Sequence, residues 1–228
     1  MEKYNITFHR IGTRTKPTNK ELFLIFCEKS YSEEIGWGFA SLSLSNTAIQ
    51  GTLLKKAIRY YQVWNEQSQL LEKKTYELLR EINFVIDIER GFCLVEGGIK
   101  DLNILKQALR QTMYNEFTYS SLSMSPFQLL EIFFKEEKLY SIENIVLSDF
   151  KSDGNFIGKY NARLINPHVE VSDLKHYTID KFNARLTSDS GTYNLIANAN
   201  MSYIVVGQEE DKLDFIDFFT TKILSYNG

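Results

Sequence analysis

Three acidic residues lie close together in the sequence and could hold a divalent metal ion. Asp87 and Glu89 are two positions apart, and Glu96 follows after a turn. Alternating residues predict a strand at 81–88 and a hairpin partner at 92–96, and carboxylates on such a pair can bind Mg²⁺ in nucleases. Restriction nucleases also carry a Glu-x-Lys sequence, whereas Glu96 precedes two glycines. The three residues are candidates for catalysis, and a solvent-exposed strand face is the simpler interpretation.

A six-residue sequence occurs twice with one conservative difference. Residues 159–164 are KYNARL, and residues 181–186 are KFNARL. As strands, both copies place an aromatic residue, Ala and Leu on one face, and Lys, Asn and Arg on the other. Because the flanking sequences differ, the simplest interpretation is one kind of amphipathic strand that occurs twice. The outward residues are Lys159, Asn161, Arg163, Lys181, Asn183 and Arg185.

These outward residues share one sheet face if the two strands are neighbours. Lys and Arg neutralise phosphates, and amides hydrogen-bond to them, so the face could bind nucleic acid or an acidic partner. The alternative is neutralisation within the chain, by Glu170, Asp173, Asp180 or Asp189.

The polar loop at 13–20 is a second basic candidate. It could bind a polyanion, although a solvated loop is the default interpretation. Its candidate residues are Arg14, Lys16 and Lys20.

The chain lacks the common metal, nucleotide and nucleophile motifs. Its three histidines, at 9, 168 and 176, have no zinc-binding spacing, and GxSxG, GxxxxGK[ST] and GxGxxG do not occur. We therefore predict no cofactor and no metal, and favour a protein that is not an enzyme. Cys27 and Cys93 lie in apolar runs, which predicts two buried free thiols.

Composition and charge are those of an ordinary folded protein. The 228 residues are 43% hydrophobic and 24% charged, and the formal net charge is −3, which argues against a protein coated by nucleic acid. Five cations lie in residues 1–20, and five carboxylates lie in residues 201–228. Since no leader-like or membrane-spanning apolar run occurs, we expect a cytoplasmic protein that does not bind membranes.

Periodicity predicts mixed elements in the first half of the chain. The continuous apolar run at 21–27 indicates a strand buried on both faces. Helical spacing of apolar residues across 52–80 predicts one long helix or two short ones, with Tyr60, Tyr61 and Trp64 in the core. The other predicted elements here are strands at 3–11 and 36–45.

The second half is predicted to be rich in strands. A helix should begin near Asp101, and Ser125 and Gln128 form the capping box of another. Grouped strands and helices indicate an α+β fold with mostly antiparallel sheet, closed by a terminal helix at 209–224. We expect a single unit at 1–228, with a boundary near 117–142 (mixed elements at 1–116, antiparallel sheet at 143–228) as the alternative. The predicted strands are 143–150, 156–165, 168–174, 176–187 and 192–206.

Three functions remain open from the sequence. The first is a non-enzymatic interaction protein, a subunit or regulator that binds another protein or itself. The second is a nucleic-acid-binding accessory protein that uses the basic strand face. The third is a metal-dependent nuclease that uses Asp87 and Glu89. A composition rich in Asn, Ile, Lys, Phe and Tyr indicates an AT-rich bacterial or phage genome, and antiphage defence is the corresponding hypothesis.

Overall fold

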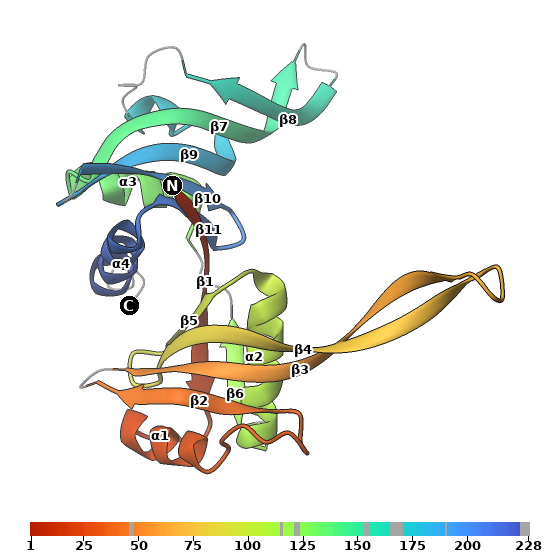
Figure 1. Cartoon of the computed structure of the whole chain (residues 1–228). Coiled ribbons are helices and arrows are strands. Elements are labelled where there is room, and N and C mark those ends of the chain that lie inside the picture. The colour runs from red at the N-terminus through yellow and green to blue at the C-terminus, as the bar shows by residue number, and fades with distance from the viewer. Residues whose placement is uncertain are drawn as a thin grey trace. The chain divides into compact units, whose positions relative to one another are not determined.

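The structure of the chain is a computed structural model. It describes residues 1–45, 48–114, 116–120, 124–152, 156–164, 171–189 and 191–223. Within these ranges it contains eleven β-strands and four α-helices (Figure 1). Mostly antiparallel sheet, with a terminal helix after the strands, fits the predicted α+β class broadly, with more sheet than we expected.

The chain divides into two compact units. Unit 1 comprises Met1–Arg10, Gly97–Ile99 and Ser120–Gly228, and unit 2 comprises Ile11–Glu96 and Lys100–Tyr119. The first strand, β1 (Glu2–Thr13), contributes residues to both units.

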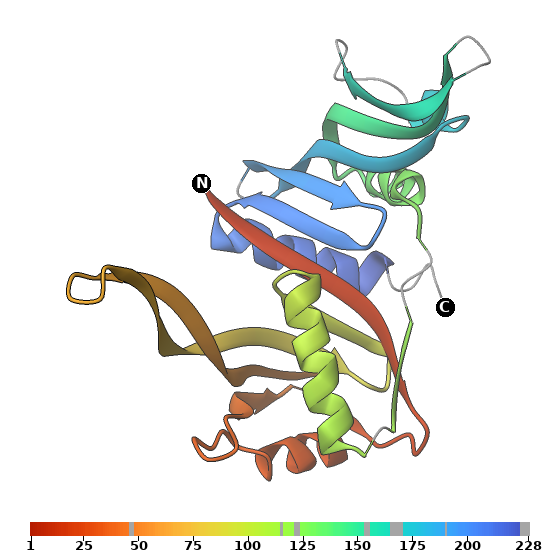
Figure 2. The same ribbon diagram turned by 90° about the vertical axis from the view of Figure 1, so that its right-hand side faces the viewer.

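Unit 1 is an antiparallel sheet with helices on one face. From the first half of β1, the strand order is β11, β10, β9, β7 and β8. Helix α3 packs on β9 and β7, helix α4 packs on β11, and Phe133 of α3 stacks on Phe218 of α4. Both helices therefore cover the same face, as Figure 2 shows. The bounds are β7 (Leu139–Ser152), β8 (Phe156–Arg163), β9 (Thr178–Ser188), β10 (Gly191–Asn198), β11 (Ser202–Gly207), α3 (Pro126–Lys135), α4 (Glu209–Phe218), a 3₁₀ turn η1 (Val171–Leu174) and a π turn η2 (Phe219–Ile223).

Aromatic side chains form the centre of the unit 1 core. Phe8 of β1 stacks on Phe219 with ring centroids 3.7 Å apart, and Tyr203 of β11 packs against Phe215. The capping box predicted for α3 is confirmed, because the Ser125 hydroxyl accepts from the Gln128 N–H and the Gln128 side chain accepts from the Ser125 N–H.

Two predictions in the second half of the chain need correction. The single strand expected at 192–206 is two strands, β10 and β11, joined by a turn in which Met201 has a φ of 60°. Of the strand expected at 168–174, residues 171–174 form the 3₁₀ turn η1, and the earlier residues lie outside the described ranges.

Unit 2 is a second antiparallel sheet covered by two helices. Its strand order is β2, β3, β4, β5 and then the second half of β1, which also pairs with β6. Helices α1 and α2 contribute Leu22, Phe26 and Leu105 to one core that also holds Leu53 and Phe84 of the sheet. The bounds are α1 (Asn19–Cys27), β2 (Trp37–Leu44), β3 (Ile49–Asn65), β4 (Leu70–Asp87), β5 (Phe92–Glu96), α2 (Ile99–Thr112) and β6 (Phe117–Ser120).

The apolar run at 21–27 is a helix, so the prediction of a buried strand was wrong. Thr18 and Glu21 form a capping box, in which the Thr18 hydroxyl accepts from the Glu21 N–H and the Glu21 carboxylate accepts from the Thr18 N–H. Leu22 and Phe26, one helical turn apart, are fully buried, whereas Leu24 is exposed. Periodicity alone cannot separate a short apolar helix from a buried strand, and here the cap decides.

The helix predicted across 52–80 was also wrong, because β3 and β4 occupy this region as a hairpin of 17 paired residues on each strand. Their pairing runs from Ile49 opposite Ile86 to Asn65 opposite Leu70. Beyond the covered base, apolar residues lie on both strand faces, so the alternation that marks a half-buried strand is lost. The turn is fixed by the Asn65 side-chain oxygen, which accepts from the N–H groups of Gln67 and Ser68.

Candidate functional site

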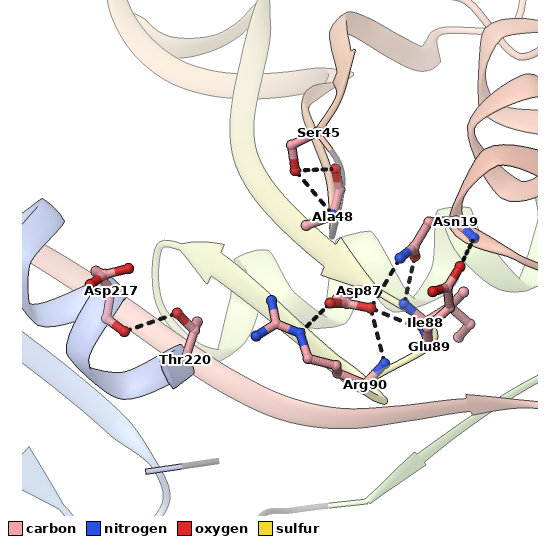
Figure 3. Close-up of polar contacts among 9 residues, drawn as sticks. All are labelled: Asn19, Ser45, Ala48, Asp87, Ile88, Glu89, Arg90, Asp217 and Thr220. Atoms are coloured by element: carbon pink, nitrogen blue, oxygen red, sulfur yellow. Dashed lines mark hydrogen bonds and ion pairs between the residues drawn. The ribbon is translucent and has the colours of Figure 1, made fainter. Parts of the chain in front are cut away.

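Asp87, the first candidate for catalysis, has a structural environment. Its side chain is fully buried, and its Oδ1 accepts hydrogen bonds from the Asn19 side chain at 3.1 Å and from the N–H groups of Glu89 and Arg90 (Figure 3). Its Oδ2 forms an ion pair with Arg90 Nε at 2.5 Å. The carboxylate therefore fixes the turn after β4 and the start of α1.

The structure does not bring the three predicted carboxylates together. Glu89 accepts a hydrogen bond from the backbone N–H of Asn19, and Glu96 lies opposite Asn83, four positions from Asp87 along β4. Four positions correspond to about 13 Å, too far for one metal ion. Within the described ranges, no three His, Cys, Asp or Glu side chains are grouped so that they could hold a metal ion.

The basic loop borders a cavity of about 440 Å³ in unit 2. Arg14, Lys16 and Lys20 are exposed, and of these only Lys16 lines the cavity. The Glu89 side chain lies in the same lining. The surroundings of Lys16 are therefore of mixed charge rather than uniformly basic.

Cys27 is exposed, which corrects the prediction of two buried thiols, and only Cys93 is buried. Burial raises the pKa of Cys93 to about 12. Cys27 is the last residue of α1, where the apolar run leaves the core. Cys93 therefore lacks both the lowered pKa and the access that a reactive thiol needs.

The two copies of the repeated sequence are not neighbours, because β7 lies between β8 and β9. Their outward residues nevertheless share the sheet face opposite the helices, since the register on both sides of β7 is unbroken between Asn144 and Val146. Asn183 is paired with Asn144, which is paired with Arg163. In the next row, Lys181 is paired with Val146, which is paired with Asn161. We call the six outward residues of the two copies the strand face: Lys159, Asn161, Arg163, Lys181, Asn183 and Arg185.

Part of the basic charge predicted for this region is neutralised within the unit. Lys159 pairs with Asp180 at 2.5 Å, and Arg185 pairs with Glu143 at 3.1 Å. The hydrogen bond from Lys159 lowers the pKa of Asp180. Asp180 was one of the neutralising residues that we expected, whereas Glu143 was not. Arg163 and Lys181 form no ion pair with any residue that the structure describes.

A cavity of about 160 Å³ opens on the strand face. The side-chain oxygens of Asn144 and Asn183 are buried there and have no hydrogen-bond partner among the described residues. The lining residues are Asn144, Val146, Asn161, Lys181, Phe182, Asn183 and Ile196. The cavity thus combines an apolar floor with amide and ammonium groups.

In the outer part of the β3–β4 hairpin the two strands pair with each other and extend past the neighbouring strands β2 and β5. This element was not predicted from the sequence. We call residues 56–79 the arm. Strand β2 pairs with β3 only as far as Lys55, and β5 pairs with β4 only from Asn83 onward. Among the described residues, no strand therefore pairs with either edge of the arm, although the Lys56 N–H donates to the Gly36 carbonyl. Figure 1 shows the arm as a twisted two-stranded ribbon that extends beyond the rest of unit 2.

The arm carries nine large apolar or aromatic side chains that are between 45% and 65% exposed. Half-exposed side chains of this size present roughly 100 Å² each, or about 900 Å² together. The largest apolar patch of a typical monomer covers about 300–600 Å². The nine residues are Ile58, Tyr60, Tyr61, Trp64, Leu70, Leu71, Tyr76, Leu78 and Leu79.

The two faces of the arm differ in how their charged side chains are paired. On the first, which we call the apolar arm face, Lys56 pairs with Glu77 at 2.7 Å, and Lys73 lies 3.9 Å from the centre of the Tyr60 ring. The internal pairing leaves the apolar side chains as its main exposed feature. Its large members are Ile58, Tyr60, Trp64, Leu71 and Leu79.

The second, the basic arm face, combines tyrosines with cations. Arg59 is paired with Tyr76, and Tyr61 is paired with Lys74. The rings of Tyr61 and Tyr76 are 5.7 Å apart. Arg59 and Lys74 form no ion pair with a carboxylate of the described residues. Glu72, opposite Val63, lies on the same face, which therefore combines exposed tyrosines with two cations and one carboxylate.

Comparison with known proteins adds no family. The sequence matches no model of a known protein family, and it matches no curated protein. Among the described helices, none combines the length and apolar character needed to cross a membrane. The strand face of unit 1 and the arm of unit 2 are therefore the two surfaces from which a function can be inferred.

Proposed function

We propose that this protein is a non-enzymatic interaction protein that binds another protein through the arm. The observation that supports this most is the exposed apolar surface of the arm, on a ribbon with no covering layer. The roughly 900 Å² of apolar side chain compares with about 800 Å² that each partner contributes to a standard interface. In this proposal the protein is a subunit or regulator of a bacterial or phage assembly in the cytoplasm.

The residue types of the arm are those that dominate protein interfaces. Trp, Tyr and Arg are the residues most enriched among interface hot spots, and charged residues are depleted at interface centres. The apolar arm face offers Tyr60 and Trp64, and its Lys56 is paired with Glu77. It therefore suits the centre of an interface.

The basic arm face indicates the chemistry of the partner. Arg59 and Lys74 lie beside exposed tyrosines and lack carboxylate partners among the described residues. A protein that holds the arm in an apolar groove should therefore place carboxylates opposite this face, because complementary charge favours encounter and register. The proposed partner is a protein with an apolar groove and an acidic rim.

Photo-crosslinking in the cells that encode the chain tests this proposal. A photo-reactive phenylalanine analogue replaces Trp64 in one variant and the exposed Tyr114 of unit 2 in the control. We expect a discrete protein adduct from position 64 that is absent from position 114. An adduct that forms equally from both positions, or none from position 64, contradicts the proposal. The mass of the adduct distinguishes a second copy of the chain from a different protein.

A further inference from the structure

We infer that the strand face of unit 1 binds a single strand of nucleic acid, with one base in the cavity and phosphates on Arg163 and Lys181. This goes beyond the proposed function, because it concerns a different unit and a different class of ligand. It depends on three observations: an open cavity, amide oxygens without partners, and cations without carboxylates within the described ranges.

The cavity has the chemistry that a nucleobase needs. Val146 and Ile196 contribute apolar surface against which the flat ring can lie. Asn144 and Asn183 line the cavity, and a rotation of the Asn144 amide would bring its partnerless oxygen from its buried position toward the exocyclic amino group of a base. Asn161 adds both a donor and an acceptor at the rim, and paired hydrogen bonds from an amide are a common way to read adenine.

Buried polar atoms without partners are costly, which is why the two amide oxygens suggest a ligand. A buried acceptor that loses its hydrogen bond costs about 1–3 kcal/mol, and native structures contain few such atoms. Asn183 already donates to Glu143 at 3.1 Å, which fixes its amide so that the oxygen is left for another donor. Asn144 is its direct neighbour on β7. A ligand with N–H groups satisfies both oxygens.

Arg163 and Lys181, which have no carboxylate partner among the described residues, lie on the two strands that flank Asn144. Arg163 is on β8 and Lys181 is on β9, with β7 between them, so their strands are about 10 Å apart. Both side chains are exposed. Cations at this separation can contact different phosphates of one strand while a base between them enters the cavity. An acidic protein could match the charges, but the carboxylates that match them only accept hydrogen bonds and would leave both amide oxygens without a donor.

The cavity selects a single strand over a duplex. Bases in a duplex are stacked and paired, so a base must be unstacked before it can enter a cavity on a sheet face. Cations alone bind either form through phosphates. Preference for the single strand is therefore the property that separates the inferred site from general attraction to polyanions.

Fluorescence anisotropy at low salt tests the inference on the full chain, with labelled 15-nucleotide single strands of DNA and RNA of mixed sequence and with the duplex of the same DNA sequence. We expect binding that weakens as salt rises and that is at least tenfold weaker in the double variant Arg163→Glu/Lys181→Glu. Asn144→Leu should weaken binding by roughly fivefold without changing the salt dependence. The matched control is Lys100→Glu/Lys135→Glu, with the same charge change at exposed helix positions. Circular dichroism melting confirms that each variant is folded.

Three results overturn the inference. The first is that wild-type protein binds neither oligonucleotide at low salt. The second is equal loss of affinity in the control double variant, which would reduce the effect to net charge. The third is a duplex that binds as tightly as the single strand, since a paired base cannot occupy the cavity. Crosslinking from the arm is independent of all three, so this inference and the proposed function can fail separately.

Discussion

At the scale of single residues, the same carboxylate can suggest chemistry in the sequence and be structural in the fold. Asp87 follows a strand and precedes Glu89, a spacing compatible with metal binding. In the structure, both oxygens of its carboxylate are bound by other parts of the chain: the side chains of Asn19 and Arg90 and two backbone N–H groups. These contacts join segments far apart in the chain, so the sequence around Asp87 alone could not reveal them.

We predict that Asp87→Ala lowers the free energy of unfolding by about 3 kcal/mol, since it removes a buried carboxylate and leaves its donors without a partner. Urea denaturation followed by circular dichroism measures this loss. The control is Glu96→Ala, at a strand end that is only partly buried, which should cost less than about 1 kcal/mol. Equal, small losses in the two variants would mean that Asp87 has no structural role.

Tyr203 should make unit 1 sensitive to alkaline pH. Burial raises the pKa of its phenol well above the usual value of 10.0, and its hydroxyl donates only to the sulfur of Met201. Below pH 10 the phenol is neutral in both the folded and unfolded chain. Above pH 10 the unfolded phenol ionises while the folded one stays protonated, so stability falls by about 1.4 kcal/mol per pH unit for this group.

Tyr203→Phe should therefore reduce the loss of stability between pH 10 and pH 11. Denaturant unfolding at several pH values measures the slope. Tyr114→Phe, at an 87% exposed position, is the control and should leave the slope unchanged. The same slope in wild-type protein and Tyr203→Phe would show that the Tyr203 phenol ionises freely in the folded chain.

At the scale of elements, the sequence predicts what local signals determine. Helix α3 was predicted because Ser125, Pro126 and Gln128 mark its start, and the strands of the second half were found because one face is buried. The strand face was predicted residue by residue, but not the presence of β7 between the two copies. Strand order depends on distant segments, which a periodicity argument does not include.

The arm shows why some elements could not be predicted from periodicity. Its residues are apolar on both faces, so neither a period of two nor a period of 3.6 is dominant, and helical spacing can be found by chance. The signals that could have identified it are the aromatic and β-branched content, such as Tyr60, Tyr61 and Val63, and the turn at Asn65.

We predict that the arm can be shortened with little effect on stability. Joining Ala57 to Leu78 by Asn-Gly keeps a paired position and supplies a two-residue hairpin turn. Nearly all residues of the removed ribbon are exposed, so the free energy of unfolding should change by less than about 1 kcal/mol. Denaturant unfolding measures this, and a loss of several kcal/mol would mean that the arm supports the core of unit 2.

At the scale of the whole molecule, the chain presents two surfaces of different chemistry in two units. The arm of unit 2 offers apolar and aromatic side chains for a protein, and the strand face of unit 1 offers cations and amides for a nucleic-acid strand. A chain that binds both would bring its protein partner to nucleic acid. Because each surface lies within one unit, variants in one unit should leave binding by the other unchanged.

The most direct test of the central claim compares capture by the wild-type chain with capture by the arm-shortened chain. Both carry the same affinity tag and are isolated, after nuclease treatment, from the cells that encode the protein. We predict that a stoichiometric protein partner accompanies the wild-type chain and is absent from the arm-shortened chain. A partner that remains bound to the folded, arm-shortened chain would contradict the claim that the arm is the protein-binding element.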